Sequence, residues 1–162
     1  MDENTPIFLS LPPLMAANTS QRAANLKSIG NEMKAAQIAL EPRYFGYSLP
    51  FGPKQSFTAE NLKYLTIEQM IEDIAFVIDR ITSRNFFNIT KKNPWILSGS
   101  SYSAMIAIWF KAMYPDMVVG VYASSPIVPT LLAPNISKKL YSNAIAGGKN
   151  CRAVLQALMK DL

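Results

Sequence analysis

The sequence predicts an α/β fold in which helices cover both faces of a parallel sheet. Short apolar runs alternate along the chain with segments whose apolar residues recur every three or four positions, the pattern of strands followed by helices. Strands that alternate with helices pair in parallel, and each connection crosses over in the right-handed sense. The chain has 162 residues, of which 49% are hydrophobic and 17% charged, and it is long enough to bury a sizeable core.

The first half of the chain predicts a strand, a helix and a second strand. An apolar run at residues 7–11 ends at a pair of prolines, and good helix formers follow from about residue 18 to residue 33. A second apolar run at residues 36–40 leads into residues 41–52, which are rich in glycine and proline. This last segment predicts a long ordered loop, and loops of this kind often carry the functional residues of α/β proteins.

The helix with the strongest pattern is predicted at residues 66–83. Its apolar residues recur at intervals of three and four, which indicates a stripe packed on the core. Thr66 and Gln69 fit a capping box, in which Thr66 accepts from the Gln69 amide and the Gln69 side chain reaches back to the cap. The predicted order is completed by a strand, a helix and a strand, at residues 94–98, 102–113 and 118–123.

The turn before the last predicted helix carries the candidate chemistry. It reads Gly99-Ser100-Ser101-Tyr102-Ser103 and resembles the G-x-S-x-G nucleophile elbow, in which a strained strand-to-helix turn lifts a serine above the sheet. In this register Ser101 is the candidate nucleophile, and Ser103 replaces the last glycine. The register centred on Ser100 would place Tyr102 where a small residue is needed, so we reject it. Taken alone, the motif fits an ordinary strand-turn-helix equally well.

Several blocks of sequence resemble, in the same order, the serine exopeptidase family of prolyl carboxypeptidase, dipeptidyl peptidase II and thymus-specific serine protease. The blocks are residues 41–52, 61–69, 95–107, 109–110, 114–115 and 123–126. The resemblance covers most of residues 6–155. It implies a partial α/β-hydrolase fold and hydrolysis of peptide bonds next to proline through an acyl-enzyme at Ser101. The backbone N–H of Tyr102 would be one oxyanion donor.

The resemblance also implies a division of the chain. Residues 1–129 would be an incomplete hydrolase core and residues 130–162 the beginning of a helical cap. Family members are much longer at both ends, so the resemblance covers only their first-half catalytic segment. The predicted strands would be strands three to six of the hydrolase sheet, at residues 7–11, 36–42, 94–98 and 118–123.

Strands four and six would then form unpaired sheet edges, because their neighbours fall outside this chain. Pro42 stands where the family usually has histidine. It fits either an edge strand or a position past the strand's end.

The chain does not hold a complete set of catalytic groups. A serine hydroxyl needs a base, normally a histidine oriented by an acid, and the 162 residues contain no histidine. The aspartates after Ser101 are Asp116 and Asp161. The family's acid lies beyond the cap, so we interpret both as surface carboxylates. Lys111 would lie about 15 Å along the helix from the elbow, too far to act as the base.

The oxyanion hole is altered as well. In α/β-hydrolases the second donor comes from the loop after strand three, where this family has a glycine-rich turn. Here that loop begins Leu11-Pro12-Pro13-Leu14, and proline has no N–H to donate. Three interpretations remain: a serine exopeptidase segment that is inactive by itself, a non-catalytic remnant of the peptidase fold, or an esterase-like hydrolase.

The resemblance implies a peptide substrate with proline near the scissile bond, and composition indicates neither a nucleic-acid nor a membrane partner. The formal charge of +5 comes from scattered lysines and arginines, which indicates a solvated surface rather than a nucleic-acid interface. No apolar run approaches the roughly 18 residues of a membrane span. Cys151 is the only cysteine, although it matches a cap position that has a disulfide partner in the family. Without histidine or a second cysteine, we expect no metal or other cofactor.

The sequence leaves the compartment open. Three Asn-X-Ser/Thr triplets, at Asn18, Asn88 and Asn135, fit the N-glycosylation pattern. The resemblance implies a secreted or lysosomal protein, whereas the acidic N-terminus does not have the features of a secretory signal.

Overall fold

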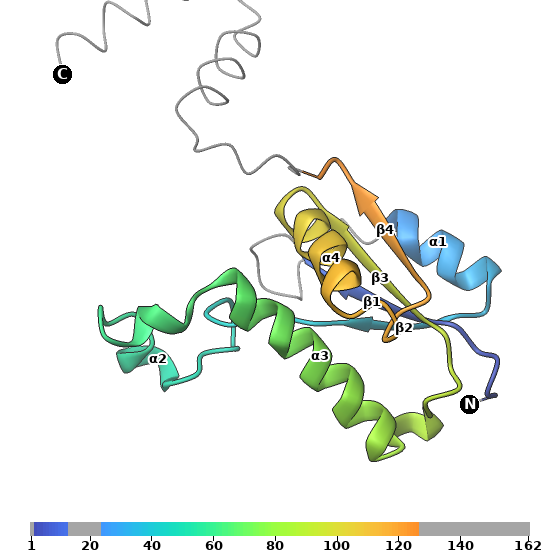
Figure 1. Ribbon diagram of the computed structural model, residues 1–162, viewed down its shortest axis with the longest axis horizontal. Coiled ribbons are helices and arrows are strands. Elements are labelled where there is room, and N and C mark those ends of the chain that lie inside the picture. Colours follow the sequence, from blue (N-terminus) through green and yellow to red (C-terminus); the bar gives the residue numbers. More distant parts are fainter. Residues whose placement is uncertain (1, 13–23, 127–162) are drawn as a thin grey trace, which may run out of the picture. The chain divides into compact units, whose positions relative to one another are not determined.

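The computed structural model describes residues 2–12 and 24–126, which form a four-stranded parallel sheet with helices on both faces (Figure 1). The strands lie in the order β2-β1-β3-β4, with all three pairings parallel. They are β1 (Ile7–Leu11), β2 (Ala36–Ala39), β3 (Trp95–Ser100) and β4 (Gly120–Ser124). This confirms the predicted fold class. The cap predicted at residues 130–162 lies outside the described residues.

The central strands β1 and β3 are buried on both faces, as is usual in parallel sheets. Ile7 lies opposite Trp95 and Leu9 lies opposite Leu97, and all four side chains are at most 3% exposed. On the other face, the Ser10 and Ser98 hydroxyls lie 3.0 Å apart and share a hydrogen bond. The outer strands β2 and β4 have only one neighbour each within the described residues, which agrees with the two expected sheet edges.

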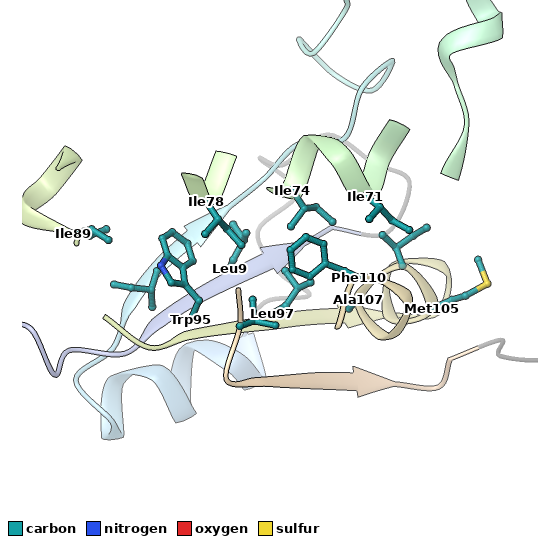
Figure 2. Packing of buried hydrophobic residues seen from close by; sticks show 13 residues of the cluster. Leu9, Ile71, Ile74, Ile78, Ile89, Trp95, Leu97, Met105, Ala107 and Phe110 are labelled. Carbon is teal, nitrogen blue, oxygen red and sulfur yellow. The ribbon is translucent and has the colours of Figure 1, made fainter. Parts of the chain in front are cut away.

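The connections place helices on opposite faces of the sheet. Helix α1 (Ala24–Glu32) joins β1 to β2, whereas α3 (Ile67–Ser83) and α4 (Tyr102–Met113) belong to connections that run the other way across the sheet. Right-handed crossovers therefore put α1 on one face and both α3 and α4 on the other (Figures 1 and 2). The predicted helix at residues 18–33 is confirmed over α1, and its first residues lie outside the described part.

Several predicted boundaries shift by a few residues. Strand β2 ends at Ala39, so Pro42 lies past its end rather than within an edge strand. Strand β3 extends to Ser100, and β4 begins at Gly120 rather than at residue 118. The loop from residue 41 leads into a short helix α2 (Gly52–Gln55) and a 3₁₀ turn η2 (Asn61–Tyr64), and a second 3₁₀ turn, η3 (Phe86–Asn88), follows α3.

The predicted cap of α3 is only half formed. The Thr66 hydroxyl accepts from the backbone N–H of Gln69 at 3.3 Å, as expected. The Gln69 side chain does not complete the box, because its amide oxygen accepts a hydrogen bond from Arg43 at 2.9 Å. The charged guanidinium of Arg43, rather than the backbone N–H of Thr66, is therefore the hydrogen-bond donor to the Gln69 side chain.

One hydrophobic core lies between the sheet and the two helices α3 and α4 (Figure 2). The core includes buried residues of the apolar stripe of α3, which confirms that the periodic residues of this helix pack inward. Phe110 of α4 is fully buried, and burying a side chain of this size stabilises the fold by about 1.5–3 kcal/mol. The labelled members in the figure are Leu9, Ile71, Ile74, Ile78, Ile89, Trp95, Leu97, Met105, Ala107 and Phe110. Among the described helices, none combines the length and apolarity that spanning a bilayer requires.

Candidate active site

The chain turns sharply at Ser101, between β3 and α4. Ser101 has φ 56° and ψ −119°, a backbone conformation that residues with a side chain rarely adopt. Its N–H donates to the carbonyl oxygen of Ser124 in β4 at 2.9 Å, and its carbonyl accepts from the Ala104 and Met105 amides at 3.1 and 3.3 Å. These bonds hold the turn from the strand side and the helix side. The Ser101 side chain is exposed beyond the carboxyl end of β3.

Gly99 is required for the close approach of β3 and α4. A Cβ atom on residue 99 would lie 2.4 Å from the carbonyl carbon and oxygen of Ser103 and 2.7 Å from the nitrogen of Ala104. Ser100 is still part of the strand and pairs in register with Ser124. The positive φ therefore falls on Ser101, in the register chosen from the sequence.

Ser103, which stands where the motif has its last glycine, makes a specific contact of its own. Its side chain is 4% exposed, and its hydroxyl donates to the carbonyl oxygen of Pro12 at 2.9 Å. A buried hydroxyl needs such a partner. The contact ties the first turn of α4 to the loop that follows β1. That loop is where the second oxyanion donor was expected, and at Pro12 it presents an acceptor to α4 and has no N–H.

Tyr102 offers a backbone donor next to Ser101. It begins α4, and the first N–H groups of a helix have no acceptor within it. The Tyr102 side chain lies between α4 and α3, where its hydroxyl contacts the sulfur of Met70 at 3.4 Å. Burial raises the pKa of the Tyr102 phenol, and the negative charge of Glu68 raises it further. The phenol therefore stays neutral throughout the ordinary pH range.

A largely apolar pocket adjoins this turn. It lies between the carboxyl ends of β1 and β2 and the facing sides of α3 and α4. The sequence pattern did not predict this pocket, although Met70 and Ile74 stand one helical turn apart on the apolar stripe of α3. The lining residues are Leu11, Pro12, Leu40, Glu41, Pro42, Met70, Asp73, Ile74, Tyr102, Ser103 and Ile106.

The loop after β2 is held against α3 by Arg43. Its guanidinium makes two 2.6 Å hydrogen bonds to the carboxylate of Asp73, in addition to its bond to Gln69. It also donates to the carbonyl oxygen of Tyr64 at 3.0 Å. The hydrogen bond to Asp73 raises the pKa of Arg43, although burial opposes this. These hydrogen bonds confirm the prediction of an ordered loop at residues 41–52. The ion pair between Arg43 and Asp73 was not predicted, because no pattern of neighbouring residues indicates it.

Two other residues considered for catalysis, Lys111 and Asp116, lie away from Ser101. Lys111 lies in the last turn of α4. Its ammonium group donates to the carbonyl oxygens of Pro115 and Val118, just beyond the helix, both at 2.6 Å. Asp116 is exposed in the same connection, at the amino end of β4. Asp161 and Cys151 lie outside the described residues. Within residues 2–12 and 24–126, no three histidine, cysteine or carboxylate side chains come together as a metal site.

Comparison with known proteins places this geometry in context. The sequence matches the family model of serine carboxypeptidase S28 over residues 1–152. Human lysosomal Pro-X carboxypeptidase is 38% identical over 97 residues, which cover 60% of this chain and 19% of that protein. The Bos taurus protein of the same name is 41% identical over an alignment of the same extent. Human thymus-specific serine protease is 30% identical over 133 residues, covering 79% and 25% of the two chains. The chain thus spans about a fifth to a quarter of the length of these curated relatives.

Proposed function

The chain belongs to the serine carboxypeptidase S28 family, and on that premise we propose that Ser101 is the nucleophile position of a serine exopeptidase. The observation that supports this most directly is the exposed hydroxyl of Ser101 on a strained turn beyond the carboxyl end of β3. Strained backbone of this kind concentrates at functional sites. The name of two relatives, lysosomal Pro-X carboxypeptidase, supports a peptide with proline beside the scissile bond as the substrate class.

In the proposed reaction, the Ser101 oxygen attacks the carbonyl carbon of the scissile bond and passes its proton to a base. The backbone N–H of Tyr102 donates to the oxyanion that forms. The base returns the proton to the departing amine, and water then hydrolyses the acyl-enzyme. The side chain of the substrate residue at the cleavage point would have access to the apolar pocket beside Tyr102.

The base for this reaction would have to come from outside the 162 residues, because they contain no histidine. Lys111 does not replace it, since its ammonium group is held by two carbonyl oxygens at the far end of α4. Removing the base of a serine protease lowers turnover by about 10⁶-fold. We therefore propose that this chain alone does not hydrolyse peptides at a measurable rate.

A non-catalytic remnant of the peptidase fold is the second candidate, and the contact between Ser103 and Pro12 favours it. In this contact, the loop from which the second oxyanion donor was expected presents the Pro12 carbonyl oxygen, which is an acceptor. Such a chain would keep the turn and the pocket without activating the hydroxyl.

The two candidates differ in whether Ser101 can be activated when a base is supplied. The experiment treats the purified 162-residue chain with a fluorophosphonate, with and without imidazole in solution, and maps the labelled residue by peptide mass spectrometry. The nucleophile proposal expects labelling of Ser101 that rises at least tenfold with imidazole and disappears in Ser101→Ala. Ser100→Ala, which alters the neighbouring exposed hydroxyl, is the matched control and keeps the labelling.

Each outcome bears on one part of the proposal. Absence of labelling under both conditions would favour the remnant. Strong labelling without imidazole would contradict the proposed inactivity of the chain alone. If Ser101 is labelled, turnover of a proline-containing dipeptide reporter against a simple ester separates a peptidase from an esterase.

A further inference from the structure

The turn between α3 and β3 exposes two phenylalanines beside an asparagine. It contains η3, and three of its residues, Asn85, Phe87 and Asn88, have φ between 52° and 59°. Phe86 is 46% exposed and Phe87 is 77% exposed, and the Asn88 side chain is exposed as well. Neighbouring aromatic rings left in water forgo the stabilisation that burial would provide, so such a patch often marks a surface that something covers.

The residues after Asn88 hold this turn firmly in place. Ile89 is 1% exposed and packs into the core (Figure 2). The backbone N–H of Thr90 donates to the side-chain oxygen of Asn93 at 2.9 Å. Asn93 in turn donates to the carbonyl oxygens of Asp2 and Thr5 at 2.8 and 3.1 Å. The Asn88 side chain, in contrast, has no hydrogen-bond partner among the described residues. The fold therefore fixes the backbone of this segment and leaves its amide accessible.

We propose that Asn88 is a site of N-linked glycosylation and that the rings of Phe86 and Phe87 pack against the first sugar. Asn88-Ile89-Thr90 is an acceptor triplet. The C–H face of a pyranose ring is apolar and would cover the exposed phenyl rings. This inference is independent of the proposed peptidase function. Asn18 and Asn135 lie outside the described residues, and the proposal does not extend to them.

The modification needs a lipid-linked oligosaccharide diphosphate as donor and a transferase of the secretory pathway. The amide nitrogen of Asn88 forms a bond to C1 of the first sugar, and the bond from C1 to the diphosphate oxygen breaks. The diphosphate leaves with the electron pair, and the amide proton passes to a base of the transferase. No oxidant or reductant takes part.

A glycan at Asn88 would leave the candidate active site open. Asn88 precedes β3, whereas Ser101 follows the carboxyl end of the same strand. A strand of this length extends about 20 Å. Figure 2 shows Ile89, the neighbour of Asn88, at the same end of the core as Trp95, which begins β3. Asn88 and Ser101 therefore lie toward opposite ends of that strand. In Figure 1 the turn after α3 leads to the amino end of β3, and α4 follows the carboxyl end of that strand.

The first experiment tests occupancy. The full 162-residue chain is expressed in eukaryotic cells behind a cleavable secretory signal, and the secreted protein is treated with peptide N-glycosidase in ¹⁸O-water. Peptide mass spectrometry is expected to find Asn88 converted to labelled aspartate, and Asn88→Gln and Thr90→Ala to remove one glycan. Asn85→Gln changes an exposed asparagine of the same turn outside the triplet and leaves the glycan in place. Secreted chain with unmodified Asn88, whether or not other sites are occupied, would overturn the proposal.

The second experiment tests the contact between sugar and rings. The melting temperature of the glycosylated protein is compared with that of the enzymatically deglycosylated protein, for the unaltered chain and for Phe86→Ala and Phe87→Ala. The glycan is expected to raise the melting temperature by a few degrees in the unaltered chain and by less in at least one phenylalanine variant. Phe76→Ala, which removes a 64% exposed ring from α3, keeps the full gain. An equal gain in all four proteins would contradict the packing of the sugar on these rings.

Discussion

The backbone of Gly99 lies against the backbone of Ser103, so closely that a Cβ atom on residue 99 would stand 2.4 Å from the Ser103 carbonyl carbon. Neither partner is the tip of a flexible side chain, so neither can move aside without shifting the helix or the strand. This contact sets the distance between the end of β3 and the first turn of α4. Ser101 lies between the two elements, and its exposed position follows from their approach.

We therefore expect Gly99→Ala to destabilise the fold by about 3 kcal/mol, since forcing atoms into a packed site costs about 1–3 kcal/mol and the obstacle here is backbone. Urea unfolding followed by tryptophan fluorescence measures the change, because Trp95 is 3% exposed in the folded protein. Gly120→Ala is the control, since a Cβ at Gly120 meets no atom within 4 Å. Equal stability of the two variants would contradict the tight contact.

The hydrogen bond from Ser103 to Pro12 predicts a second, smaller effect. Ser103→Ala leaves the Pro12 carbonyl oxygen without this donor, and we expect a loss of about 1 kcal/mol in the free energy of unfolding. Ser100→Ala removes an exposed hydroxyl from the same turn and should change stability by less than about 0.5 kcal/mol. The same urea titration compares the two. A Ser103→Ala variant as stable as the parent would mean that the hydrogen bond contributes nothing.

The ion pair of Arg43 with Asp73 predicts measurable coupling between the loop and α3. A double-mutant cycle with Arg43→Met and Asp73→Asn should give a coupling energy of about 1 kcal/mol, because the contact has two hydrogen bonds but the Asp73 side chain is 38% exposed. The pair of Lys92 and Glu3 is the control.

In the control pair the nitrogen and oxygen lie 2.8 Å apart, but the two side chains are 70% and 62% exposed. A cycle with Lys92→Met and Glu3→Gln should therefore give a coupling near zero. Added salt should weaken the coupling of Arg43 with Asp73 only in part. Equal coupling in the two cycles would show that the second hydrogen bond and the greater burial of Arg43 do not matter.

Burial of Tyr102 predicts a loss of stability in alkaline solution. Because its pKa is raised above the usual 10.0 in the folded protein, the unfolded chain loses this proton first. Above about pH 10 the unfolded state thus binds fewer protons than the folded state, and the free energy of unfolding falls as pH rises toward the folded pKa. Tyr102→Phe should reduce this fall, as measured by urea unfolding between pH 8 and about 11.

Tyr47→Phe is the control for that series, because Tyr47 is 92% exposed. It should reproduce the alkaline loss of the parent protein. If Tyr102→Phe also reproduces it, the buried phenol is not the group responsible.

The sequence by itself determined the alternation of strands and helices, the apolar stripe of α3 and the position of the turn at Ser101. These depend on residues close together in the chain, where the spacing of apolar side chains and the small residues of a tight turn act directly. The family resemblance rested on the same local blocks. The prediction failed where a local partner was assumed, as when Gln69 was expected to complete its own helix cap and instead accepts a hydrogen bond from Arg43.

Only the tertiary structure decided which distant groups meet. Ser103 and Pro12 are 91 positions apart, and Arg43 and Asp73 are 30 apart, yet each pair is in hydrogen-bond contact. The strand order β2-β1-β3-β4 brings the loops after β1 and β2 beside α4 and α3, and the apolar pocket forms where they meet. Such contacts depend on how the helices and strands pack together, and the pattern of neighbouring residues in the sequence does not predict that packing.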